Sequence, residues 1–397
     1  MDLFNSKKYF DGKVSHGFVS LYTGKTIIMI ASGLLGLFLP IFIYDLFGQS
    51  FKYTALFFAF GYFLYMTFVI WGAKFLNKFG FRRSLRLSAF LGAFYYTIFY
   101  FLKEDNLIYL LPLAIITLLT YRLFYWLPYH VDFAKFTSRR NRGRQIATIK
   151  ATREIMGIIL PIAAGFIISR FGFDVLFIMA VILFLVSVIP YLSIPRTREK
   201  FTWTFLETWK NFFSKKCRKT ILAFVAVGAE DATVIVIWPI FIFQLLEGNY
   251  LQVGALSTFI IAITVILNLT LGRALDKKIP KEKILKLGSI FYSSGWIIKI
   301  FISTAFQIFA AGVYHNLVRI FTRMPFDTLA YESAADQEHY VDEFTVLHEI
   351  AVNLGKTAIL VIAIVSSLFF AIQWVFLLAA LASIAFNFLS TKIILYR

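Results

Sequence analysis

The sequence predicts an all-α integral membrane protein in which twelve transmembrane helices form two pseudo-symmetric six-helix bundles. Its composition is the first reason. The 397 residues are 59% hydrophobic and 16% charged, whereas a soluble surface carries about 25–35% charged residues. The apolar segments are long enough to cross a bilayer and too numerous to be buried inside one soluble core.

An internal repeat is the second reason. The segment Arg122–Pro128 (RLFYWLP) resembles Arg319–Pro325 (RIFTRMP), at an offset of 197 residues. The segment Pro40–Gly48 (PIFIYDLFG) recurs as Pro239–Gly248 (PIFIFQLLEG), at an offset of 199 residues. A nearly constant offset of half the chain length indicates two homologous halves.

The predicted order along the chain is a cytosolic N-terminal segment (1–25), a six-helix bundle (26–194), a cytosolic linker (195–219) and a second six-helix bundle (220–397). Within the linker, the aromatic stripe of Phe201–Phe213 predicts an amphipathic helix at the membrane surface. Each span has about twenty residues. The spans are expected to begin near Thr26, Tyr53, Ser84, Asn106, Gln145, Phe173, Thr220, Tyr250, Leu285, Gln307, Phe344 and Ala371.

Charge predicts the orientation. The loops after spans two, four, six and eight are rich in Lys and Arg, while the alternate loops carry almost none. Positively charged loops remain cytosolic, so both termini are expected in the cytosol of a bacterial or archaeal cell, with the protein in its cytoplasmic membrane. The formal net charge of +18 is therefore assigned to contact with anionic lipid rather than with nucleic acid.

Two loops at equivalent places carry the family resemblance. Gly72–Arg83 (GAKFLNKFGFRR) and Gly272–Lys283 (GRALDKKIPKEK) resemble the G-x-x-x-D-[RK]-x-G-[RK]-[RK] loop of the major facilitator superfamily. Asn77 stands where this loop has a carboxylate, which puts the charged contact of the loop with neighbouring helix ends in doubt. The matching positions are Gly72, Asn77, Gly80, Arg82 and Arg83 in the first loop, and Gly272, Asp276 and Lys277 in the second.

The resemblance covers the whole chain and implies a secondary transporter. Such a protein rocks two bundles about a midplane site that spans one, four, seven and ten line. Span ten carries His315, Arg319 and Arg323 at four-residue spacing, and span four carries Arg122 and Trp126. We expect these five residues to bind substrate, because guanidinium groups form bidentate hydrogen bonds to anions.

Glu230 and Asp231 lie in span seven, roughly 17 Å from its start and therefore near the midplane. One of them is expected to bind a coupling proton, because burial and a like-charged neighbour raise a carboxyl pKa. Neighbours on a helix diverge by about 100°, so only one faces the cavity. Alternatively, Arg319 neutralises Glu230 or Asp231 as a structural pair, and the two interpretations are compatible.

The loops after spans four and ten have opposite charge, which predicts an electrostatic gate at the cytosolic mouth. Attraction between them favours closure of that mouth, although each exposed pair contributes at most about 1 kcal/mol. The alternative is that the acids only solvate a loop. The expected gate residues are Arg139, Arg140, Arg142 and Arg144 on one side, and Glu332, Asp336, Glu338, Asp342 and Glu343 on the other.

The sequence contains no phosphate-binding GKS or GKT loop, no nucleophile elbow and no zinc motif, so an enzyme is not expected. No cofactor and no metal are expected either. The predicted protein is a monomeric secondary transporter that uses a proton gradient to move a small polar or anionic solute across the membrane. The alternative from another class is a receptor or lipid-handling protein on the same scaffold.

Overall fold

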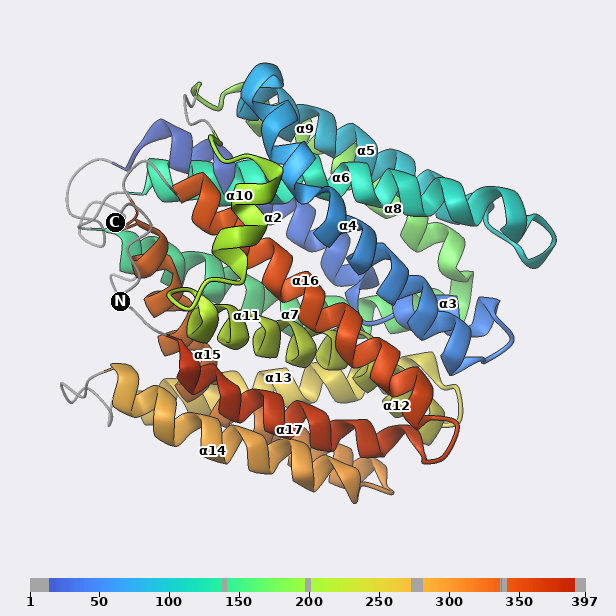
Figure 1. Ribbon diagram of the computed structural model, residues 1–397. Helices are drawn as coiled ribbons and strands as arrows, with labels where there is room; N and C mark the ends of the chain where they lie inside the picture. The colour runs from blue at the N-terminus through green and yellow to red at the C-terminus, as the bar shows by residue number, and fades with distance from the viewer. Residues whose placement is uncertain are drawn as a thin grey trace, which may run out of the picture.

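The structure is a computed structural model that describes residues 14–137, 141–196, 201–272, 281–335, 337 and 341–389. The described residues form helices and no strand, and most helices run along one common direction (Figure 1). The first half contains α2 (His16–Gly36), α3 (Leu39–Leu46), α4 (Phe51–Phe79), α5 (Phe81–Phe101), α6 (Leu107–Phe136), α7 (Arg142–Phe171), α8 (Phe173–Val186) and α9 (Val188–Leu192). The linker contains α10 (Phe205–Phe212), and the second half contains α11 (Arg218–Ala232), α12 (Trp238–Leu245), α13 (Tyr250–Gly272), α14 (Lys281–Ile300), α15 (Ala305–Ala335), α16 (Val341–Ser366) and α17 (Val375–Ala385).

Each predicted span coincides with a helical segment of the described chain. Eight of these segments are long and apolar enough to cross a membrane: α2, α4, α6, α7, α8–α9, α11–α12, α13 and α16. The segments at α5, α14, α15 and α17 do not meet this criterion. In α15 the reason is visible in the sequence, because Arg319, Arg323 and Asp327 lower its hydropathy. That these four helices also cross the membrane stays a prediction.

The first helix of each half is interrupted at the repeated proline segment. Pro40 lies in the first turn of α3 and Pro239 in the first turn of α12, where the missing N–H of proline removes no helical hydrogen bond. Both segments end in tight turns at Gly48 (φ 60°) and Gly248 (φ 80°), a backbone region that glycine enters without steric penalty. We call this end of the molecule the glycine-turn end.

The two halves contact each other along α4–α16, α7–α13 and α3–α12. Small residues allow α7 and α13 to approach closely: a Cβ atom on Gly254 would lie 2.3 Å from the carbonyl oxygen of Pro161. Beside this proline, the Thr258 hydroxyl donates to the Ile158 carbonyl (2.8 Å) and accepts from the Ile162 N–H (3.2 Å). The second half thus supplies polar partners to the helix that Pro161 disturbs.

The linker is attached to both halves at the opposite end of the molecule, which we call the linker end. Asn77 of α4 donates to the Phe201 carbonyl (2.7 Å) and accepts from the Phe201 N–H (2.9 Å). Glu343 of α16 accepts from the Thr202 N–H and from its hydroxyl, both at 2.7 Å. The amphipathic helix therefore begins later than predicted, at Phe205 after the capping residue Thr204, because residues 201–202 use their backbone in these contacts.

Candidate functional site

A cavity of about 580 Å³ lies between the two halves. The predicted lining spans all contribute to it through α2, α6, α11 and α15, and so do α4, α5, α7 and α16. Its walls combine ionisable groups with many aromatic rings. The rings are those of Phe58, Tyr62, Tyr65, Tyr95, Tyr96, Tyr121, Tyr125, Trp126, Tyr129, Phe133, Phe184, Phe326, Tyr331 and Phe344.

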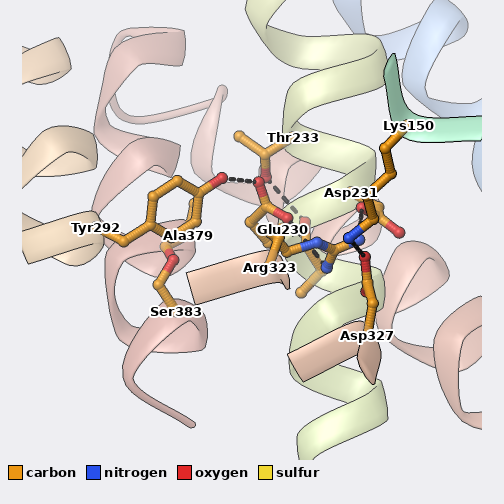
Figure 2. Close-up of polar contacts among 10 residues, drawn as sticks. Lys150, Glu230, Asp231, Thr233, Tyr292, Arg323, Asp327, Ala379 and Ser383 are labelled. Carbon is orange, nitrogen blue, oxygen red and sulfur yellow. Dashed lines mark hydrogen bonds and ion pairs between the residues drawn. The ribbon is translucent and has the colours of Figure 1, made fainter. Parts of the chain in front are cut away.

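One wall of this cavity carries a carboxylate–guanidinium cluster (Figure 2). Arg323 of α15 donates from Nη2 to Asp231 Oδ1 at 2.9 Å, and its Nη1 lies 3.6 Å from Glu230 Oε2. The hydroxyl of Tyr292, from α14, donates to Glu230 Oε1. Glu230 is fully buried, so this guanidinium and this phenol replace the water that a carboxylate needs.

The two carboxylates point in different directions, as expected for neighbours on a helix. Asp231 lines the cavity, while Glu230 is turned into the second half. A turn of π-helix (Thr233–Ile237) follows them directly, and the Thr233 hydroxyl donates to the Ala229 carbonyl at 3.0 Å. Single π-turns inside α-helices are frequent at functional sites. The structure thus places Asp231, and not Glu230, at the cavity surface.

The predicted substrate residues do not all meet at the cavity. Arg122, Trp126 and Arg323 line it, whereas His315 and Arg319 are not among its described lining residues. We expected the whole stripe of span ten to face the cavity, but only its part at Arg323 does so. Each four-residue step turns about 40° around a helix, so a long stripe leaves the face where it began. The cation that neutralises the carboxylates is accordingly Arg323 and not Arg319.

His315 and Lys299 lie behind the cluster, within the second half. His315 packs against the rings of Tyr292 (4.3 Å between centroids) and Trp296 (4.6 Å), and no described residue forms a hydrogen bond with either of its ring nitrogens. Lys299 is only 3% exposed, with Nζ 3.9 Å from the ring centroid of Trp238 and 4.1 Å from that of Trp296. Lys299 is therefore caged by aromatic rings.

Three lysines line the cavity without having been predicted from the sequence: Lys25, Lys150 and Lys356. Lys25 was expected in the N-terminal segment, but α2 begins at His16, so Lys25 lies within this helix and lines the cavity. Lys356 of α16 also lines it. The only sequence signal for Lys25 or Lys356 was a lone lysine beside a long apolar run. Such a signal is ambiguous because most lysines of this kind extend to the membrane surface.

Polar contacts join the two halves in the part of the cavity that lies toward the linker end. Lys150 Nζ of α7 lies 3.2 Å from Asp327 Oδ2 of α15. His130 Nε2 of α6 lies 3.7 Å from Glu349 Oε1 of α16, and the Tyr331 hydroxyl lies 3.4 Å from His130 Nδ1. His130 and Asp327 are equivalent in the repeat, at the offset of 197. The two halves therefore place different chemistry at matching positions of one interface.

The proposed charged gate is only partly described. Arg139, Arg140, Asp336 and Glu338 lie outside the described residues, as do Asp276 and Lys277 of the second signature loop. Arg142 and Gly272 are helix termini whose side-chain environment is not described, and Arg144 is exposed. Glu332 pairs with Lys281 of its own half (2.6 Å), and Asp342 and Glu343 are buried. Among the described residues, Glu332 and Glu343 thus bind the second half and the linker, not the basic loop.

The first signature loop has structural roles. Gly80 has φ 86° between α4 and α5, a conformation that favours glycine. A Cβ atom on Gly72 would lie 2.8 Å from Leu123 Cδ2 of α6. Asn77 binds the linker backbone, so an amide side chain makes a polar contact at the place of the family's carboxylate. Arg82 is partly exposed and Arg83 is exposed.

We expect the Lys150–Asp327 pair to hold the linker end closed, so Asp327→Asn should open it. The pair is about a third exposed, and its loss should change the open population by at most about fivefold. Distances between spin labels on Lys78→Cys and Lys286→Cys, in a Cys217→Ser background, measure the opening. Glu332→Gln removes an ion pair within one half at the same end and serves as the control. Equal distance distributions in both variants would contradict the assignment.

The fold and this central polar cavity are those of a family of membrane transporters. The chain matches the Major Facilitator Superfamily over residues 21–340 and belongs to that family. It is 24% identical over 242 residues to the uncharacterized protein YqgE of Bacillus subtilis (strain 168). That alignment covers 59% of this chain and 56% of the curated relative, so the chain matches little more than half the length of that protein.

Two solved structures resemble the whole fold. The human organic anion transporter MFSD10 (TETRAN) has a TM-score of 0.71 at 10% identity, with 96% of this chain and 100% of that chain covered. A mutant of the peptide transporter POT in complex with alafosfalin has a TM-score of 0.65 at 10% identity, with 94% and 93% covered. At this identity the likeness shows the fold alone.

Proposed function

We propose that this protein is a proton-coupled secondary transporter for a small polar or anionic solute, with its linker end in the cytosol. The observation that carries the proposal is the Glu230–Asp231–Arg323 cluster, which joins a fully buried carboxylate to one on the cavity wall. Ionisable groups inside a membrane are costly, and a scaffold gains little from an unmatched one. A receptor on the same scaffold would not need this cluster.

Charge balance explains how the cluster couples a proton to a solute. Two carboxylates and one guanidinium give a net charge of −1 when all are ionised, so binding one proton makes the cluster neutral. Asp231 is the accessible acceptor because it faces the cavity. Its protonation removes the charge that holds Arg323 Nη2 at 2.9 Å. The guanidinium is then available to an anionic or hydrogen-bonding solute, while Glu230 keeps its contact with Tyr292.

Alternating access requires that the two ends of the cavity close in turn. At the linker end, Lys150–Asp327 and His130–Glu349 join the halves. At the glycine-turn end, Gln244 donates to the Tyr44 hydroxyl at 2.7 Å, and the Tyr250 hydroxyl donates to Asp45. We propose that residues 26–194 and 220–397 rock as units and exchange one set of contacts for the other.

Transport by reconstituted protein tests this function. A pooled metabolite uptake screen in proteoliposomes identifies the solute, and its accumulation is then driven by an imposed pH gradient. Asp231→Asn should abolish gradient-driven accumulation and spare solute exchange, because the charge that a proton must neutralise is already absent. Glu230→Gln should also impair accumulation. Lys52→Gln, outside the cavity lining, is the control. Full accumulation in both acid variants would refute the proton role.

A further inference from the structure

The cavity carries more positive than negative charge. Six cationic side chains line it (Lys25, Lys150, Lys356, Arg122, Arg153 and Arg323), against three carboxylates (Asp231, Asp327 and Glu349). Ion pairs use Arg323 and Lys150 among the cations, and Glu349 lies beside two histidines. The other four cations form no ion pair with an acid in the part of the chain that the structure describes. Of these four, Lys25 is buried, Arg122 and Lys356 are partly buried, and Arg153 is exposed. Their excess of positive charge favours an anion in the cavity.

The first pair of these cations shares one aromatic ring. The Arg122 guanidinium carbon lies 4.7 Å from the ring centroid of Tyr62, and Lys356 Nζ lies 5.1 Å from the same centroid. Arg122 belongs to the first half and Lys356 to the second, so the halves meet at this ring. Arg122 Nη1 is buried and has no hydrogen-bond partner among the residues that the structure describes. An oxygen of a bound anion would accept a hydrogen bond from this donor.

The second group of cations lies about one helical turn away. Trp126 follows Arg122 by four residues on α6, about 6 Å along the helix axis. Lys25 Nζ lies 4.6 Å from the Trp126 ring centroid, and 5.0 Å and 4.7 Å from those of Tyr125 and Tyr129. Lys25 is 6% exposed, and these rings offer it faces but no counter-charge. Arg153 lines the same cavity.

We propose that the cavity binds an organic dianion with a planar, unsaturated body, one anionic group between Arg122 and Lys356 and the other near Lys25. This inference rests on the proposed function, because it takes the cavity as the transport site. The aromatic walls favour a flat ligand, since rings pack face to face or edge to face. A volume of about 580 Å³ is that of a small-molecule pocket.

Binding of a small set of related probes to the purified protein in detergent tests the inference. Terephthalate carries two carboxylates at opposite ends of a ring, benzoate carries one, and terephthalamide has the same shape without charge. Calorimetric titration should show that terephthalate binds at least tenfold more tightly than benzoate, and that terephthalamide does not bind. Phthalate, with adjacent carboxylates, should bind more weakly than terephthalate because its charges cannot reach both groups of cations.

Variants assign the binding to these residues. Arg122→Gln and Lys356→Gln should each weaken terephthalate binding by tenfold or more, and Arg122→Lys should also weaken it because the planar fork is lost. Lys52→Gln, whose lysine lies over Tyr53 outside the cavity, should bind as the unmodified protein does. A cooperative thermal melt of each variant without ligand shows that the variant is folded. The two glutamine variants test the site independently, because Arg122 and Lys356 belong to different halves.

Three results would overturn the inference: no terephthalate binding by folded protein, equal binding of terephthalamide, or unchanged binding in both glutamine variants. The outcome is separable from that of the proposed function. Terephthalate binding without gradient-driven uptake of any solute would sustain the dianion site and refute the transporter. Gradient-driven uptake of a neutral solute, with no terephthalate binding, would support the transporter and refute the dianion site.

Discussion

Gly228→Ala leaves little folded protein, although it adds a single methyl group. Gly228 of α11 packs against α16, and a Cβ atom there would lie 1.9 Å from the backbone carbonyl oxygen of Val352. Backbone cannot move aside as a side chain can, so the two helices must separate. Overpacking of this kind destabilises a core by about 3 kcal/mol in severe cases. Gly355→Ala should act alike, because its Cβ would lie 1.9 Å from the Val225 carbonyl oxygen.

Size-exclusion chromatography and thermal melting in detergent measure this effect. Gly36→Ala is the matched control, since a Cβ atom at Gly36 of α2 would have no atom of the described chain within 4 Å. It adds the same methyl group in a helix and should melt as the unmodified protein does. A Gly228→Ala protein that melts within a degree of the Gly36→Ala protein would show that α11 and α16 are not packed as described.

Arg323→Gln strongly destabilises the protein and abolishes transport. It removes the cation beside Glu230, which is fully buried, and beside Asp231. Removing one partner of a buried ion pair typically costs about 3–5 kcal/mol, because the remaining charge stays without compensation. The double variant Arg323→Gln with Glu230→Gln should recover much of the stability, since the fully buried charge of Glu230 is then gone and the remaining unpaired carboxylate, Asp231, faces the cavity. It should not recover transport.

Thermal melts of the single and double variants form a double-mutant cycle that isolates the coupling between the two side chains. Arg83→Gln, at an exposed position on α5, is the control for the loss of an arginine. Additive losses in the cycle would show that Arg323 and Glu230 do not act as one electrostatic unit. Recovery of both stability and transport in the double variant would show that the cluster serves folding alone.

The fold could be predicted from the sequence because hydropathy and the repeat are properties of long segments. Two sets of six apolar segments, related by a nearly constant offset, permit few architectures. Helices occur at all twelve expected places. The site required finer information. The choice between Glu230 and Asp231, and between Arg319 and Arg323, depends on the rotation of single helices. A prediction that places helix ends only within several residues leaves that rotation undetermined.

Lys25 and Glu343 show why other residues could not be assigned from the sequence. Lys25 was placed in the N-terminal segment because the long apolar run begins only after it, at Thr26, yet the helix begins ten residues earlier, at His16. Glu343 belongs to an acidic run that resembles a solvated loop, and its burial depends on a linker from a distant part of the sequence. The pattern of neighbouring residues in the sequence does not show contacts between such distant segments.

The attachment of the linker sets a length limit on the motion of the halves. Asn77 and Glu343, one from each half, bind the successive residues Phe201 and Thr202. More than twenty residues join the two bundles in sequence. The two attachment points, Phe201 and Thr202, are nevertheless only one residue apart, which is about 3.5 Å of extended chain. Wider separation there must break one attachment. Hydrogen bonds to a charged group such as Glu343 contribute about 1.5–3 kcal/mol, so the amide of Asn77 is the end that releases first.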